Sequence, residues 1–166
     1  MFVRSARSED VEAIALIMAA LAEEGLIATE APVDLEAQAR RFREVIEADS
    51  PTAAWVLEDA GRVVGNASVH ERGSGVLYLG MGISPQARGR GGGRAFLEAI
   101  LEHAYACGAH KLELEVWLDN ARAIAVYAAA GFEVEGLRRN HYRRRDGRLR
   151  SALLMARLLQ ADEPPR

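Results

Sequence analysis

The chain has 166 residues, of which 49% are apolar and 27% charged, a composition typical of one globular domain with a substantial core. Its formal net charge of −3 disfavours a general nucleic-acid binder or a protein that coats membrane surfaces. No apolar run approaches the roughly 18 residues of a membrane span, and the single cysteine, Cys107, excludes an intrachain disulfide. We therefore expect a cytoplasmic protein with no signal peptide and no membrane partner.

The first part of the chain predicts a short strand and then helices. The opening residues, MFVRSA, favour a strand, and Ser8 is the expected N-cap of a helix that ends at Gly25. Asp34 is the expected N-cap of the next helix, which the cluster at 49–51 stops. Both segments place apolar residues at helical spacing, so each is expected to bury one face.

Strand-like runs follow, AAWVLE, RVVGNASVHE and VLYLGMGI, and the turn signals between them favour an antiparallel meander. A glycine-rich stretch then opens a helix that Gly108 closes, and KLELEVW alternates as a further strand. Asn120 is the expected cap of a short helix that ends at Gly131.

The last runs, FEVEGLR and RLRSALLMARLL, read as two strands around a tight turn at 145–148. The order of elements predicts a single α/β (α+β) domain with a mixed sheet over residues 1–160. The segment 161–166 is expected to be a disordered tail.

The glycine-rich stretch QARGRGGGRAFLEAI, residues 86–100, places four glycines and three arginines ahead of an apolar helix. Glycine lacks a Cβ, so successive amides can point into one concavity, and a helix N-terminus favours an anion there. A phosphate or pyrophosphate is the expected guest. The stretch lacks the Gly-Lys-Ser/Thr of a P-loop, and Arg94 stands where a dinucleotide fingerprint needs its third glycine. A flexible loop entering a surface helix is the alternative interpretation.

Two motifs occur together in this chain. The segment Gln86–Gly91 fits the pattern Q/R-x-x-G-x-G/A, and Asn120, Ala123, Tyr127 and Gly131–Phe132 fit N-x-x-A-x-x-x-Y-x-x-x-G-F. In both motifs and in the order of elements, the chain from residue 2 to 159 resembles the GNAT superfamily of acetyl-CoA-dependent N-acetyltransferases. The resemblance implies the GNAT fold, a central mixed, mostly antiparallel sheet of about seven strands flanked by about four helices.

The same resemblance implies acetyl-CoA as the acyl donor. Its pyrophosphate is expected on the backbone amides of the loop residues Arg88, Gly89, Arg90, Gly91, Gly92, Gly93 and Arg94. The strand end at Met81, Gly82 and Ile83 is expected to pair with the pantetheine arm and to offer a backbone N–H to the oxyanion. A β-bulge at Gly80 and Gly82 is a compatible alternative. Asn120 is expected to hydrogen-bond the cofactor arm in addition to capping its helix.

The resemblance makes Tyr127 the candidate general acid, because a phenol with a pKa of about 10 is protonated at neutral pH and can donate to a leaving thiolate. A packed aromatic on the helix is the alternative role for this side chain. The general base is left open. The options are ordered water without a dedicated base, or a carboxylate from the set Glu30, Glu71, Glu113, Glu115 and Asp119.

Substrate contacts are expected from Thr29 and Glu30 in the loop 25–34, from Glu115, and from the end of the last two strands. The acceptor is expected to be the primary amine of a small molecule, an amino acid or an analogue. Ser151 stands where amino-acid-acetylating relatives often carry an acidic residue. The alternatives are a peptide or protein N-terminal acetyltransferase and a non-catalytic acetyl-CoA sensor.

The segment RRNHYRRRDGRLR, residues 138–150, is strongly basic. An exposed hairpin facing solvent or a second subunit is the expected form, and contact with an acidic substrate or a coenzyme phosphate is the alternative. Nucleic-acid binding is disfavoured by the negative net charge. The four histidines show no ligand spacing, so no metal is expected. Relatives suggest a homodimer.

Overall fold

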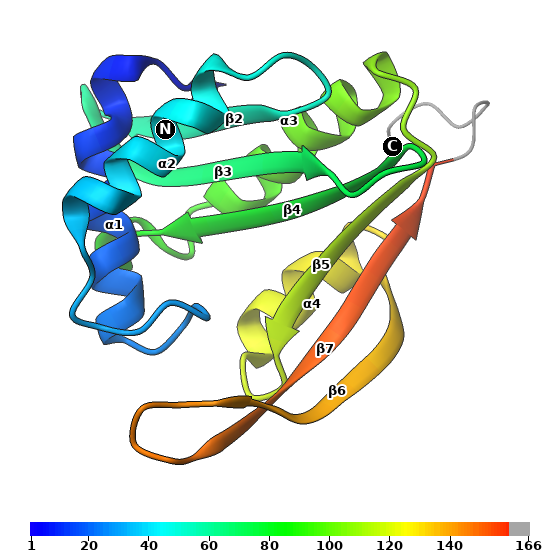
Figure 1. The fold of residues 1–166 in the computed structure, drawn as a ribbon. Helices are drawn as coiled ribbons and strands as arrows, with labels where there is room; N and C mark the ends of the chain where they lie inside the picture. Colours follow the sequence, from blue (N-terminus) through cyan, green and yellow to red (C-terminus); the bar gives the residue numbers. More distant parts are fainter. Residues whose placement is uncertain (160–166) are drawn as a thin grey trace.

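The computed structural model describes residues 1–159, which form a seven-stranded sheet with helices on both faces (Figure 1). The strands lie in the order β1-β2-β3-β4-β5-β7-β6, and β4–β5 is the parallel pair among antiparallel ones. This confirms the expected mixed, mostly antiparallel sheet, whereas the expected tail at 161–166 lies outside the described residues. The strands are β1 (Phe2–Ser5), β2 (Ala53–Asp59), β3 (Arg62–Glu71), β4 (Val76–Ile83), β5 (Lys111–Trp117), β6 (Glu133–Arg143) and β7 (Leu149–Leu158).

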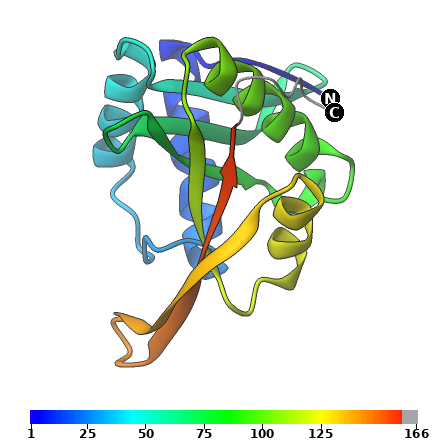
Figure 2. The same cartoon turned by 90° about the vertical axis from the view of Figure 1, so that its right-hand side faces the viewer.

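The helices cover the two faces of the sheet in pairs. Figure 2, turned by 90°, shows α1 and α2 on one side of the strands and α3 and α4 on the other. Their bounds are α1 (Val11–Glu23), α2 (Leu35–Glu47), α3 (Gly92–Ala106) and α4 (Ala121–Ala129), and short 3₁₀ turns occupy Ser8–Asp10 and Pro85–Ala87.

Apolar packing on both faces holds the sheet in place. The larger core lies under α3, where Phe96 and Ile100 are fully buried with strand residues such as Leu112. A smaller core joins Ile14 of α1 and Phe42 of α2 to the sheet. Helix α2 is amphipathic, because it buries Gln38 and Phe42 and leaves its arginines and glutamates exposed.

The start of α1 differs from the prediction. Ser8 begins a 3₁₀ turn and is not the cap, because the carboxylate of Asp10 accepts the backbone N–H of Arg7 at 2.8 Å. Arg4 donates to the same carboxylate at 2.8 and 2.9 Å, and this pairing lowers the pKa of Asp10. The predicted caps Asp34 and Asn120 are confirmed as acceptors from the backbone N–H three residues later, at 2.9 and 3.2 Å.

Strands β4 and β5 pair only briefly and then separate. Their parallel register runs from Val76–Lys111 to Tyr78–Glu113 and stops there. The rest of β4 stays paired with β3, and the rest of β5 with β7, so the two facing backbone edges have no strand partner within the described sheet. Figure 1 shows the two strands diverging toward α1 and the β6–β7 hairpin. This opening positions the candidate site.

Candidate active site

A cleft of about 1200 Å³ occupies the opening between β4 and β5. We call the part beside the glycine-rich loop before α3 the loop end. The part lined by Arg41, His70, Tyr78, Glu115 and Tyr142 is the hairpin end. The cleft brings together most of the sequence-predicted site residues, namely Met81, Gly82, Ile83, Arg88, Gly89, Gly91, Gly92, Gly93, Arg94, Glu115, Asn120 and Tyr127. Arg90, Thr29 and Glu30 lie outside its lining.

The glycine-rich loop turns its backbone toward the loop end. Gly89 and Gly91 have φ angles of 76° and 87°, in the left-handed region that glycine adopts without strain. Gly91 is also the N-cap of α3, so the first amides of that helix lack carbonyl partners within the helix. A Cβ on Gly92 would lie 2.5 Å from Cδ2 of Leu57, so the loop packs tightly on the core. Amides arranged in this way bind phosphate groups.

The arginine side chains of this loop are paired within the domain. Each guanidinium lies between 2.7 and 2.9 Å from its partners, which are Glu24 and the carbonyl of Ile83 for Arg88, Asp59 for Arg90, and Glu98 for Arg94. The pKa of Glu24 is lowered by its bond from Arg88. The loop therefore offers an anion its backbone N–H groups more than its arginine charges.

A further arginine, Arg122, supplies charge that sequence analysis missed. It follows Asn120 on α4 and lines the cleft, and a Cβ on Gly89 would lie only 2.8 Å from its Nη2 atom. Within residues 1–159 its guanidinium forms no ion pair or hydrogen bond. The signal was present in the sequence as an arginine inside the second motif, but its approach to the glycine-rich loop depends on the tertiary fold.

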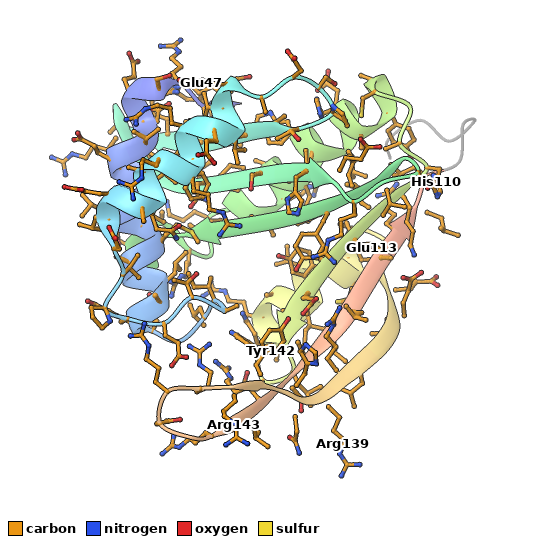
Figure 3. The ribbon with its side chains drawn as sticks, viewed as in Figure 1. Glu47, His110, Glu113, Arg139, Tyr142 and Arg143 are labelled. Carbon is orange, nitrogen blue, oxygen red and sulfur yellow. The ribbon has the colours of Figure 1, made fainter. Side chains whose placement is uncertain are left out.

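We expect Arg122→Ala to raise the Kd for coenzyme A about 10- to 100-fold, because an unpaired guanidinium beside the loop contributes roughly 1.5–3 kcal/mol to a phosphate contact. Isothermal titration calorimetry at two ionic strengths measures this, and the loss should shrink at high salt. Arg139→Ala is the matched control, since Arg139 lies on β6 and points away from the cleft (Figure 3). Equal affinities for the two variants would remove Arg122 from the binding site.

Tyr127 and Asn120 lie on the α4 side of the cleft. The Tyr127 ring packs edge-on against Phe132, with centroids 5.8 Å apart, and the side chain is 6% exposed. Burial, with a smaller effect of Tyr78, raises the pKa of Tyr127 above its ordinary value, so the phenol stays protonated at neutral pH. The side-chain carbonyl oxygen of Asn120 caps the helix, and the NH₂ group of the same side chain is still able to donate hydrogen bonds.

Glu115 lies on β5 within a cluster of polar side chains at the hairpin end. The hydroxyl of Tyr142 donates to Oε2 of Glu115, and Nε of Arg138 lies 3.2 Å from Oε1. Burial and the bond to Glu115 raise the pKa of Tyr142 to about 12. The Tyr142 ring also packs edge-on against Trp117, with centroids 5.0 Å apart. Figure 3 shows Tyr142 on the inner side of the hairpin, near β5.

An irregularity in β6 lies between Arg138 and Tyr142, the two residues that contact Glu115. The register with β7 shifts between Arg138 and Tyr142, and Asn140 has a φ of 51°. The backbone N–H of Asn140 donates to Oγ of Ser151 at 2.9 Å. Asparagine tolerates the left-handed region of backbone conformations better than most residues, so Asn140 could have indicated a bulge from the sequence. Tyr142 was not among the predicted site residues, because the basic composition of the segment 138–150 indicates mainly an exposed hairpin.

Neighbouring residues of β3 and β4 form the floor of the cleft. Asn66, Ser68 and His70 alternate along β3 and pair in register with Gly82, Gly80 and Tyr78 of β4. All of them line the cleft, and Asn66 is 3% exposed with no partner for its Oδ1 atom in the described chain. A Cβ on Gly80 would meet no atom within 4 Å, so the backbone there is open to a ligand.

The β6–β7 hairpin is tied to the connection between α1 and α2. Arg144 donates to the carbonyl of Ala28 at 2.8 Å and lies 3.6 Å from Glu30, whose carboxylate also accepts the backbone N–H of Arg145 at 3.0 Å. Arg150 donates to the carbonyl of Gly25 at 2.5 Å. The basic segment is therefore partly engaged within its own chain, a role absent from the sequence expectations. Substrate contacts of Thr29 and Glu30 stay a prediction.

Membrane-spanning helices and metal-binding clusters were both considered for residues 1–159. No helix among residues 1–159 is long and apolar enough to cross a membrane. The same residues contain no cluster of three or more His, Cys, Asp or Glu side chains that could hold a metal ion. Cys107 is half-buried, and its Sγ donates to the carbonyl of Ala104 at 3.4 Å.

The fold and the split between β4 and β5 define a class of protein. Residues 17–132 match the acetyltransferase (GNAT) family, and the chain belongs to it. The family uses acetyl-CoA as acyl donor.

Individual relatives show how far the likeness extends. Over 74 residues the chain is 40% identical to the ribosomal protein bS18-alanine N-acetyltransferase of Escherichia coli strain K12, covering 45% of this chain and 49% of that protein. It thus spans about half the length of this curated relative. The crystal structure of a ribosomal-protein-alanine N-acetyltransferase from Brucella melitensis has a TM-score of 0.86 at 27% identity, covering 96% of this chain and 100% of that one. A phosphinothricin acetyltransferase from Sinorhizobium meliloti, in complex with acetyl-CoA, shares the fold with a TM-score of 0.85 at 24% identity, covering 99% and 92%.

Proposed function

We propose that the protein transfers an acetyl group from acetyl-CoA to the primary amine of a small molecule, an amino acid or an analogue. The observation that carries this proposal is the meeting of a buried phenol, Tyr127, and a carboxylate, Glu115, in one cleft that also reaches a phosphate-type loop. Direct transfer needs these parts: an anchor for the donor, a proton acceptor for the amine and a proton donor for the thiolate.

The residues of the cleft fit acetyl-CoA. Amides of residues 88–94 and the side chain of Arg122 would take its phosphates. The unpaired edge of β4 at Met81–Ile83 would hydrogen-bond the pantetheine arm as an added strand and offer an N–H to the oxyanion. Bound there, the donor supplies an acyl carbon whose bond to sulfur breaks when nitrogen attacks.

Glu115 is our candidate base. Among the carboxylates considered from sequence, it is the one that lines the cleft. Glu113 is paired with Lys111 at 2.8 Å, Glu30 with Arg144, and Asp119 with Arg150 at 2.6 Å. Glu115 also has partners, but a carboxylate has about four lone-pair sites, and its hydrogen bond from Tyr142 and its ion pair with Arg138 leave room for an ammonium. Glu115 could also act as the base through a water molecule that it orients, which would carry the proton from the amine to the carboxylate.

Tyr127 completes the reaction. As the C–S bond breaks, its hydroxyl donates a proton to the departing thiolate, and the phenolate regains a proton from solvent. The raised pKa of Tyr127 keeps the donor form populated throughout the physiological range. The packing against Phe132 fixes the ring, which limits the directions in which the hydroxyl can donate.

The enclosure of the hairpin end supports a small acceptor. The ties from Arg144 and Arg150 to the connection between α1 and α2 join two walls of this region. The second candidate acceptor is a peptide N-terminus. It is favoured by the two relatives named as ribosomal-protein-alanine N-acetyltransferases, which act on a protein by their names.

The experiment is a measurement of thiol release from acetyl-CoA with a panel of acceptors. The panel contains free amino acids, phosphinothricin, polyamines, aminoglycosides and hexapeptides with free N-termini. We expect free amino acids to give the highest kcat/KM. Turnover confined to the hexapeptides would establish the second candidate, and tight coenzyme A binding without turnover of any acceptor would indicate a sensor.

A further inference from the structure

Charge is distributed unevenly among the side chains that line the hairpin end. Glu115 is neutralised there by Arg138 and hydrogen-bonded by Tyr142. Arg41 of α2 lines the same region and forms no ion pair or side-chain hydrogen bond within residues 1–159. Other arginines of the cleft differ, because Arg88 and Arg94 are paired with carboxylates and Arg157 with a carbonyl. Arg41 and Arg122 are thus the cleft-lining arginines that have no partner among the described residues.

These two arginines belong to opposite ends of the cleft. Arg122 lies beside Gly89 in the loop that fits the phosphates of the donor. Arg41 belongs to α2 and lines the hairpin end near His70 of β3, where the proposed function places the acceptor. The donor's phosphates therefore account for Arg122 and leave Arg41 unexplained.

His70 lies near Arg41 at the hairpin end of the cleft. Its ring lies 5.3 Å from the ring of Tyr78, and the Arg72 guanidinium stacks 3.8 Å from the centroid of that same Tyr78 ring. Burial first, and then the positive charges of Arg72 and Arg41, lower the pKa of His70. An imidazole that lines the cleft therefore senses two nearby guanidinium groups, and a neutral imidazole remains able to donate one hydrogen bond.

We propose that Arg41 and His70 form the subsite for a carboxylate of the acceptor, so that the protein selects amines that carry a free carboxylate near the reacting nitrogen. This inference rests on the proposed function. A guanidinium suits a carboxylate because its parallel N–H groups can bind both oxygens at once. His70 adds a donor on the β3 side, and Glu115 faces the amine from β5. An α-amino acid presents the matching pair of groups, one cationic and one anionic.

Acceptor pairs that differ only in the carboxylate test the subsite. We would measure kcat/KM for L-alanine, L-methionine and L-histidine, each against its primary amide, in the wild type and in Arg41→Ala. The wild type should prefer the free acid at least about 10-fold, as expected for a charge-assisted pair. Arg41→Ala should abolish that preference by lowering kcat/KM for the free acids to the level measured for their amides in the same variant, and Arg41→Lys should retain part of it.

Arg40→Ala is the matched control, because Arg40 is the neighbouring arginine on α2 and lies 4.0 Å from Glu36 instead of in the cleft. The preference of Arg40→Ala for the free acid over the amide should equal that of the wild type. Equal use of acid and amide by the wild type, or a preference that survives Arg41→Ala, would overturn the subsite.

Calorimetric titration of the same amino acids into the enzyme saturated with coenzyme A gives the comparison without turnover. Binding that depends on Arg41 supports the subsite, and absence of binding by all three amino acids overturns it. Turnover of peptides in that case would leave the acetyltransferase proposal standing, so the two failures are distinguishable.

Discussion

Tyr127→Phe should lower kcat about 10²- to 10³-fold and leave the Kd for acetyl-CoA within about twofold. The substitution removes one oxygen and keeps the ring that packs against Phe132, so the cleft retains its shape. In the proposed mechanism leaving-group protonation is the step that suffers, because Tyr127 is the hydroxyl that α4 presents to the cleft. Stopped assays of thiol release and calorimetry on the same preparation separate the two quantities.

The pH dependence sharpens this prediction. A general acid works in its protonated form, and burial raises the pKa of Tyr127, the proposed acid, above the ordinary value of 10.0. Loss of the acid should therefore begin only above pH 10, and kcat of the wild type should show no fall from this residue between pH 7 and pH 9. A sensor domain would bind acetyl-CoA equally well with Phe at this position and would show no change in any other property. An enzyme with unchanged kcat in Tyr127→Phe would contradict the acid role.

Local signals in the sequence were sufficient for most of the fold. The caps Asp34 and Asn120, the glycine that opens α3 and the turn at 145–148 depend on residues close in the chain, and the structure confirms each of them. The prediction for the start of α1 was wrong, because neither Ser8 nor Asp10 caps the helix with its side chain. The Asp10 carboxylate is held instead by Arg4, on the neighbouring strand, and by the backbone N–H of Arg7.

Only part of the site could be predicted from the sequence, because some of its contacts join residues that are distant in the chain. Tyr127 and the glycine-rich loop belong to contiguous motifs, and both reach the cleft. The partners of Glu115, Arg138 and Tyr142, lie 23 and 27 residues further along the chain, before and after a shift in the register of β6 with β7. The arginines of the glycine-rich loop suggested free positive charge at the site, but each of them forms an ion pair with a carboxylate. Arg122 and Arg41, outside the loop, are the cleft-lining arginines that are unpaired in the described chain.

Glu115→Gln should lower kcat/KM for the amine about 10²-fold, because the amide cannot accept the proton that the ammonium must lose. Gln has nearly the same shape and can still accept a hydrogen bond from Tyr142, so the acceptor wall should persist. The KM for acetyl-CoA should be unchanged, since the loop end is built from other residues. Steady-state kinetics with the acceptor varied at saturating acetyl-CoA measures the effect.

Glu113→Gln provides the matched control. Glu113 lies two residues earlier on the same face of β5, but its carboxylate is held by Lys111 and it lies outside the residues that line the cleft. We expect its loss to change kcat/KM less than about twofold, because a partly exposed ion pair contributes little. Tyr142→Phe should fall between the two, since it removes one bond to Glu115 and leaves the carboxylate in place. If Glu115→Gln and Glu113→Gln were equally active, the amine proton would leave through water alone, and the charge cluster around Glu115 would serve only to hold the hairpin against β5.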